Sequence, residues 1–244
     1  MWPVWLPYFL CLVIPAAILI IIYYTQITLG ISQIVRHFLE PIVGEGNVKI
    51  INGDFLTSTK GIYFLALPNS MPSRLFSGIN LIVTLVLLGF FIYKAKKNSL
   101  ISFFFLMVMV VHFVSSMFFL IAPQFFPYDI TVFSELYIEQ QISIWLVLVL
   151  FAGLIFGTTG SPNIFTKIGY FLLLSVYSAV FGILRYFVFL VILYQASVIY
   201  MGVMFFILGP LFDFLYLVGI YVFYIYRSMR QLSDIKEINR WQWL

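Results

Sequence analysis

Long uninterrupted apolar segments are the feature that most constrains how this chain can fold. They run for about 18 to 30 residues, and a helix needs roughly 20 apolar residues to cross a hydrocarbon core of about 30 Å. Only 9% of the 244 residues are charged and 63% are hydrophobic, whereas a soluble domain carries roughly a quarter charged residues. The sequence therefore predicts an all-α protein whose solvent is the lipid bilayer.

The hydropathy pattern predicts a bundle of six transmembrane helices in one integral membrane domain. The expected spans are residues 4–24, 77–93, 100–121, 142–156, 168–194 and 197–226. The fourth is the shortest, and residues 139–141 are expected to extend its helix outward. No basic residue precedes the first apolar run and no convincing cleavage site follows it, so the first span is expected to be an uncleaved helix.

The basic residues lie at the ends of these spans, so the formal charge of +4 indicates membrane orientation and no nucleic-acid partner. One side of a six-span bundle carries Lys94, Lys96, Lys97, Lys167 and the tail after Arg227. The other side carries one long loop with four basic residues and a shorter, acidic loop. Because long loops weigh less in topology selection, the positive-inside rule predicts that both termini are cytoplasmic.

The long external loop, residues 25–74, is expected to contain β structure. Two β-forming runs flank Asn52-Gly53, a pair typical of two-residue hairpin turns that require positive φ. The sequence therefore predicts a hairpin that turns at Asn52-Gly53, with residues 61–67 as a third strand; an ordered linker is the alternative. An exposed strand edge can accept a partner strand, so this loop is the predicted protein-binding surface.

Two further segments border the membrane. Residues 27–39 are expected either to continue the first helix outward or to lie flat on the membrane. The tail, residues 227–244, mixes charged residues with Ile, Trp and Leu, which predicts an amphipathic helix on the cytoplasmic headgroups.

Three polar residues lie at membrane depth, where a charge costs at least about 2.5 to 3.5 kcal/mol: His112, Arg185 and Asp213. Arg185 can meet Asp213, or instead Glu139 or Glu135 at the outer end of the fourth span. Counting residues from the external turn leaves Arg185 and Asp213 roughly 9 Å apart along the bundle axis unless tilt or a kink at Pro210 closes the gap. These five residues form either an externally open polar site or a buried structural pairing, and the second interpretation is favoured.

Cofactor chemistry finds little support in the sequence. The only other histidine, His37, lies outside the spans, which disfavours haem, so His112 is expected to be neutral and hydrogen-bonded. The single cysteine, Cys11, excludes a thiolate zinc cluster or a dithiol pair within the chain. Common nucleotide, hydrolase and zinc-protease motifs are absent. We therefore assign no catalytic residue, metal ligand or cofactor from the sequence.

Residues 139–187 resemble the exosortase and archaeosortase family of membrane peptidase-transpeptidases in layout. The segment from Glu139 to Ile144 stands where that family carries its nucleophile motif, and the segment from Phe181 to Tyr186 stands where it carries an Asn-x-x-Arg-type motif. The resemblance implies a bacterial or archaeal plasma membrane. No cysteine occupies the nucleophile position and no histidine follows Arg185, so the resemblance implies a non-catalytic relative or companion.

Three functions remain open at this point. The first is a non-enzymatic component of an envelope complex for export, surface assembly or exosortase-like sorting, with the lipid bilayer and a protein as its partners. The second is a transporter or channel built around Arg185, Asp213 and the interrupted helix at Gly209-Pro210. The third is a membrane enzyme that uses external acids. No small-molecule substrate follows from the sequence.

Overall fold

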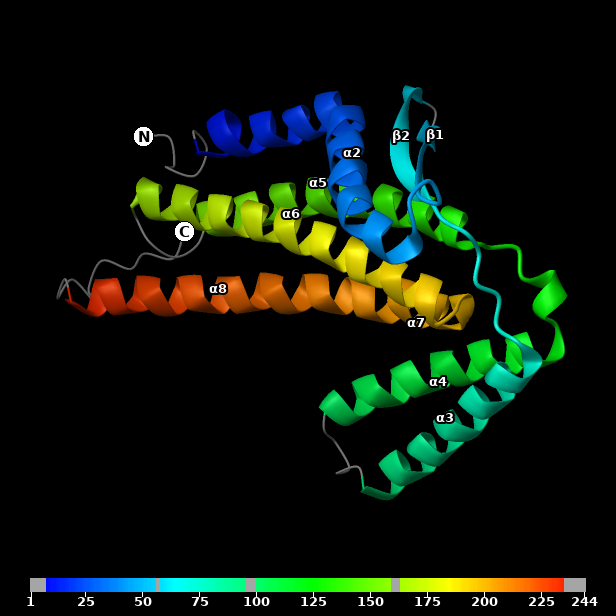
Figure 1. Ribbon diagram of the computed structural model, residues 1–244. Coiled ribbons are helices and arrows are strands. Elements are labelled where there is room, and N and C mark those ends of the chain that lie inside the picture. Colours follow the sequence, from blue (N-terminus) through cyan, green and yellow to red (C-terminus); the bar gives the residue numbers. More distant parts are fainter. Residues whose placement is uncertain (1–7, 56–57, 95–99, 159–162, 235–244) are drawn as a thin grey trace. The chain divides into compact units, whose positions relative to one another are not determined.

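The computed structural model of the protein describes residues 8–55, 58–94, 100–158 and 163–234 (Figure 1). Within this part, six helical segments are long and apolar enough to cross a membrane. Their bounds are Phe9–Val43, Arg74–Tyr93, Ser102–Ile121, Ile130–Thr158, Ile164–Gln195 and Val198–Arg230. A two-stranded sheet is the only β structure in the described residues. The predicted all-α fold with six spans and a small β-containing loop is thus confirmed.

The elements follow the chain in a simple order. They are η1 (Phe9–Val13), α2 (Ile14–Val43), β1 (Lys49–Phe55), β2 (Ser58–Ala66), α3 (Arg74–Lys94), α4 (Leu100–Ile121), η2 (Pro123–Phe125), α5 (Ile130–Thr158), α6 (Ile164–Gln195), η3 (Val198–Tyr200), α7 (Met201–Val203), η4 (Met204–Leu208) and α8 (Gly209–Asp234). Residues 27–39 belong to α2, so they continue the first helix. The tail is helical up to Asp234, the end of α8; residues 235–244 lie outside the described part.

Helix α5 begins well before residue 142, where the fourth span was predicted to start. Asp129 explains this start, because its Oδ1 accepts a hydrogen bond of 2.7 Å from the backbone N–H of Val132. An aspartate in this position caps the free N–H groups of the first helical turn. The acidic segment that looked like an external loop therefore contains an N-cap and the first turns of a helix.

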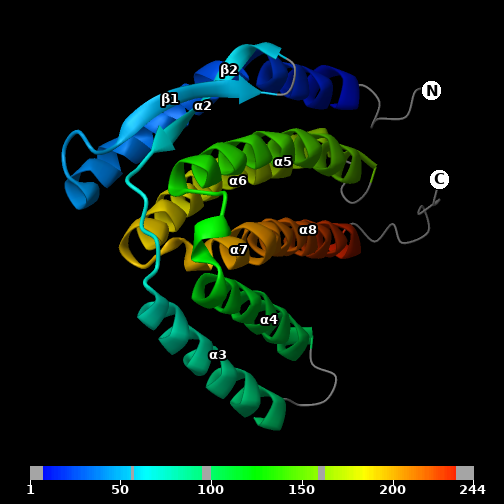
Figure 2. The same ribbon diagram turned by 90° about the vertical axis from the view of Figure 1, so that its right-hand side faces the viewer.

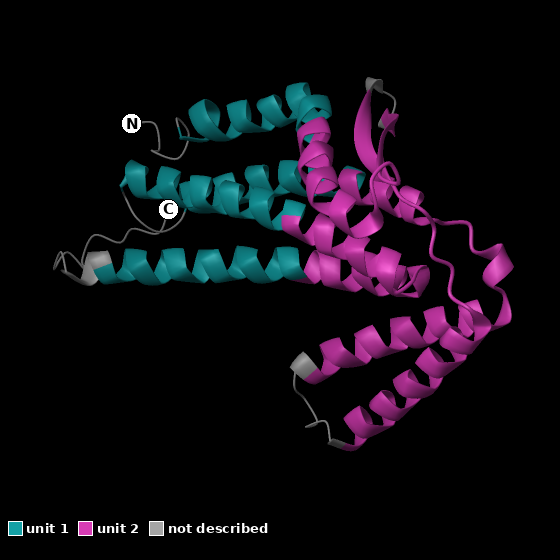
Figure 3. Ribbon diagram, in the orientation of Figure 1, with its two compact units in different colours: residues 1–27, 139–183, 212–244 teal, residues 28–138, 184–211 magenta. Residues whose placement is uncertain are grey.

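The chain divides into two compact units, which Figure 3 distinguishes by colour. Unit 1 comprises Met1–Ile27, Glu139–Ile183 and Phe212–Leu244. It contains parts of α2, α5, α6 and α8, and its core is built from apolar and aromatic side chains. Twelve buried residues form this core: Tyr8, Val13, Ala17, Leu148, Val149, Ala152, Phe156, Tyr170, Phe171, Leu174, Tyr216 and Tyr224.

Unit 2 comprises Thr28–Ile138 and Leu184–Leu211. It contains the rest of α2, the β-hairpin, α3, α4, the beginning of α5, the end of α6 and the short helices η3, α7 and η4. Figure 2 shows the two strands alongside α2. Two hydrogen bonds fix this contact: the backbone N–H of Tyr63 in β2 donates to the hydroxyl of Thr28, and the hydroxyl of Ser32 donates to the carbonyl of Tyr63.

The hairpin does not turn at Asn52-Gly53, and that prediction is wrong. Both residues lie inside β1, which pairs antiparallel with β2 so that Asn52 faces Tyr63 and Gly53 faces Ile62. The positive φ angles near this loop belong instead to Gly44 and Gly46, where the chain leaves α2. A Cβ on Gly53 would lie 2.5 Å from Oε1 of Glu135 and 2.7 Å from the ring of Phe64. Glycine is needed at position 53 for this close approach.

Candidate functional site

Arg185 lies in α6, and its side chain is buried in unit 2. Its Nε donates a hydrogen bond of 2.8 Å to the hydroxyl of Tyr137 in α5, and its Nη1 donates one of 2.6 Å to the carbonyl of Gly209. The guanidinium also lies over the Tyr137 ring, 5.5 Å from its centroid, which is a favourable cation–π distance. These contacts tie α6 to α5 and to the first residue of α8.

Tyr186, the next residue of α6, extends this cluster to the hairpin. Its ring stacks on that of Tyr137 with centroids 5.0 Å apart. Its hydroxyl hydrogen-bonds with the hydroxyl of Ser134, and the backbone N–H of Leu65 donates to both oxygens, at 3.1 and 3.0 Å. A continuous set of contacts therefore runs from Arg185 through Tyr137, Tyr186 and Ser134 to strand β2. We call these four residues the anchor cluster.

The acidic candidates occupy different surroundings. Glu135 of α5 lies against Gly53 of the hairpin, as described above. Asp213 belongs to unit 1, where its Oδ1 accepts a hydrogen bond of 3.0 Å from Tyr216, whose hydroxyl also bonds with Ser178. Glu139 lies in the unit 1 part of α5, and its backbone carbonyl accepts from Ser143. The pairing of Arg185 with Asp213 or Glu139 spans the two units and stays a prediction.

His112 lies in α4 and stacks on Tyr200 of η3, with ring centroids 5.0 Å apart and planes 6° from parallel. The Tyr200 hydroxyl donates to Oδ1 of Asn80 in α3, so the three residues join three elements of unit 2. The expected hydrogen bond of His112 is not seen at Nδ1, which is buried without a partner in the described residues; the same holds for the hydroxyl of Ser116. In this part of the chain, no group of three or more His, Cys, Asp or Glu residues could hold a metal ion.

The two edges of the hairpin differ in whether their backbone groups are hydrogen-bonded. Along the edge of β2 that faces away from β1, Tyr63 bonds through both its N–H and its C=O to hydroxyls of α2. The N–H of Leu65 on the same edge bonds to the anchor cluster. Because these two residues direct their backbone groups away from β1, their partners Asn52 and Ile50 direct theirs to the opposite edge. In the described residues, no hydrogen bond occupies that edge of β1.

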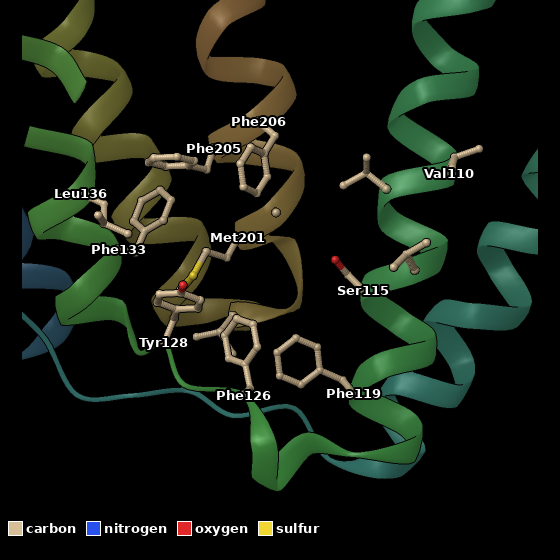
Figure 4. A pocket seen from close by; sticks show the side chains of 14 residues that line it. Val110, Ser115, Phe119, Phe126, Tyr128, Phe133, Leu136, Met201, Phe205 and Phe206 are labelled. Carbon is tan, nitrogen blue, oxygen red and sulfur yellow. The ribbon is translucent and has the colours of Figure 1, made fainter. Parts of the chain in front are cut away.

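A cavity of about 570 Å³ lies within unit 2 between α4, the beginning of α5 and the segment from η3 to η4 (Figure 4). Its volume is in the range of small-molecule pockets, but its lining contains no charged residue. The lining residues are Val110, Val111, Val114, Ser115, Phe119, Phe126, Tyr128, Phe133, Leu136, Val198, Met201, Gly202, Phe205 and Phe206. Such a wall favours an apolar occupant.

Sequence reasoning found Arg185 but missed the side chains that surround it. Ser134 and Tyr137 lie in the predicted acidic loop and Tyr186 lies in the fifth predicted span, and nothing in their spacing indicates that they meet. The one available signal is that Tyr186 follows Arg185 directly, since a tyrosine beside a buried arginine has a polar end to satisfy.

Comparisons of the chain with protein-family models, with curated proteins and with solved structures find no match.

Proposed function

We propose that this multi-pass membrane protein is a non-enzymatic component of an envelope complex and that it binds a protein partner along the free edge of β1. The observation that carries the proposal is the difference between the two hairpin edges. Strand β2 is fixed by hydroxyl groups of α2, α5 and α6, whereas the backbone groups of Ile50 and Asn52 face outward and Asn52 is exposed. A strand held in this way is a ready template for an added strand.

Proline at position 52 tests this proposal. Asn52 does not contribute its N–H to the β1–β2 ladder, so Asn52→Pro removes an outward donor and leaves the ladder intact. We expect the tagged wild type to migrate in a native gel as part of a larger assembly, and Asn52→Pro to migrate as the smaller free protein at equal abundance. Mass spectrometry of the larger band identifies the partner.

Asn52→Ala is the matched control, because it removes the same side chain but keeps the backbone N–H. It should retain the assembly. Ile51→Pro, which breaks the ladder itself, gives the reference for a misfolded hairpin. An Asn52→Pro protein that keeps the full assembly would exclude the β1 edge as the contact.

The class of complex proposed here rests on the resemblance to exosortases. One contact supports it, because it brings together the α5 and α6 segments on which the resemblance depends. Gln141 packs against Gly182 in unit 1, with its amide nitrogen 2.7 Å from the position of a Cβ on that glycine. Since the segment has no cysteine, we propose a role in sorting, export or surface assembly without thiolate catalysis.

A transporter is the second candidate, and the interrupted helix before α8 favours it. Between Gln195 and α8 the chain passes through the 3₁₀ helix η3, the short α7 and the π-helix η4, and π-turns are frequent at functional sites. If Arg185 and Asp213 serve transport, Arg185→Gln and Asp213→Asn should each abolish the transport of solute into proteoliposomes. Both variants should still reach normal abundance in the membrane. A parallel loss of abundance and flux would indicate a structural role instead.

A further inference from the structure

A groove of about 420 Å³ runs between α6 and α8 on unit 1. Thr166, Gly169, Tyr170 and Leu173 line it from α6, and Phe223 and Arg227 line it from α8. Tyr170 is buried and its ring lies 6.2 Å from that of Phe223. Leu173 and Phe223 are about half exposed, at 49% and 53%, so they form open apolar sides of the groove.

The polarity of the groove changes along its length. The hydroxyl of Thr166 and the guanidinium of Arg227 lie toward the beginning of α6 and the end of α8. Leu173 lies roughly 10 Å further along α6, at a rise of 1.5 Å per residue, and so deeper in the span. Arg227 has neither a hydrogen bond nor an ion pair with the residues that the structure describes. The groove thus offers an unpaired cation at its headgroup end and an apolar channel toward the membrane interior.

We propose that this groove binds one anionic phospholipid. The phosphate accepts hydrogen bonds from Arg227 and Thr166, and one acyl chain lies over Gly169 along Leu173 and Phe223. An arginine fork matches phosphate oxygens, and charge complementarity favours an anionic headgroup over a zwitterionic one, whose own cation competes with Arg227 for the phosphate. Gly169 leaves space for the chain, since no heavy atom lies within 4 Å of the position of a Cβ on this residue.

The combination of a cation with an apolar channel argues for a lipid over a soluble anion. A soluble phosphate ion would use Arg227 and Thr166 but would leave the apolar channel empty. A phospholipid uses both ends.

The test is lipid retention by the purified full-length protein in native mass spectrometry. Phosphatidylglycerol and phosphatidylcholine with identical chains are the probes, and the wild type should retain severalfold more of the first. Arg227→Gln should remove this preference, and Gly169→Leu, which fills the channel, should reduce retention of both lipids.

Two controls make the result specific. Arg230→Gln makes the same charge change on α8 outside the groove, and Gly219→Leu makes the same size change at a glycine that also has open space around it; both should behave like the wild type. Equal losses in Arg227→Gln and Arg230→Gln, or full retention by Gly169→Leu, would overturn the proposal. Displacement of the lipid by millimolar inorganic phosphate would also overturn it, because the site would then be a soluble-anion site.

Discussion

The backbone N–H of Leu65 has two acceptors, and both come from distant helices. Leu65 itself is fully buried, and the hydroxyls of Ser134 and Tyr186 lie in equally dry surroundings. A buried donor without an acceptor costs about 1 to 3 kcal/mol. Either hydroxyl alone satisfies this donor, so the two residues are expected to be interchangeable for stability until both are lost.

A double-mutant cycle tests this expectation. Ser134→Ala and Tyr186→Phe should each lower the free energy of unfolding by less than about 1.5 kcal/mol, because one acceptor remains. The double variant should lower the free energy of unfolding by about 1 to 3 kcal/mol more than the sum of the two single changes. Titration with a denaturing detergent measures the stability, and hydrogen exchange at Leu65 reports whether the hairpin detaches. Strict additivity would show that the two hydroxyls do not share the Leu65 donor.

Glycine has two separate uses among the elements. Gly53 and Gly153 serve close packing, whereas Gly44 and Gly46 adopt positive φ at the end of α2. A Cβ on Gly153 of α5 would collide with the side chain of Val13 in the first helix. Small residues let transmembrane helices approach one another in this way.

Gly153→Val should therefore destabilise unit 1. Val13 is fully buried and cannot move aside without disturbing the core, so the expected loss is about 1 to 3 kcal/mol, the usual cost of overpacking. Gly219→Val in α8 is the matched control, because nothing lies within 4 Å of a Cβ there. The midpoint of thermal unfolding should fall for the first variant and stay near the wild-type value for the second. Equal midpoints would mean that the first helix and α5 separate readily.

The prediction of elements failed where a residue type has two roles. Asn52-Gly53 is typical of a turn, but Gly53 is small in order to accommodate Glu135 and Phe64, and no local sequence pattern reveals a contact with a residue so distant in the chain. Asp129 lies between the predicted third and fourth spans, in the segment that the sequence predicts to be the acidic loop, although aspartate before an apolar helix is also an N-cap signal. Read in that way, it would have predicted the start of α5.

At the scale of the molecule, hydropathy was sufficient for the number of spans, since a bilayer imposes one length on every helix that crosses it. It gave no information on how the buried polar groups pair, because Arg185 binds Tyr137 and the carbonyl of Gly209, neither of which carries a charge. Charge alone indicates acids as the partners of a buried arginine. The anchor cluster therefore had to come from the structure.

Orientation in the membrane is tested by cysteine labelling in a Cys11→Ala background. The positive-inside rule predicts that Lys96→Cys is cytoplasmic and that the loops containing Asn52 and Phe125 face outward. Both of these residues are exposed, so Asn52→Cys and Phe125→Cys should react with an impermeant reagent in intact cells. Lys96→Cys should react only after permeabilisation. Labelling of position 96 in intact cells would contradict the six-span orientation.

The anchoring of β2 also sets an order of events during synthesis. Leu65 binds a hydroxyl that follows 121 residues later in the chain, and a ribosome adds roughly 5 to 20 residues per second. Leu65 is therefore made about 6 to 24 seconds before Tyr186. At the start of this delay, α2 is the one helix among those that fix β2 that has been made, so Leu65, buried in the finished protein, lacks its contacts with α5 and α6. The nascent loop is then open to chaperones and proteases on its side of the membrane, and the arrival of α6 ends its exposure.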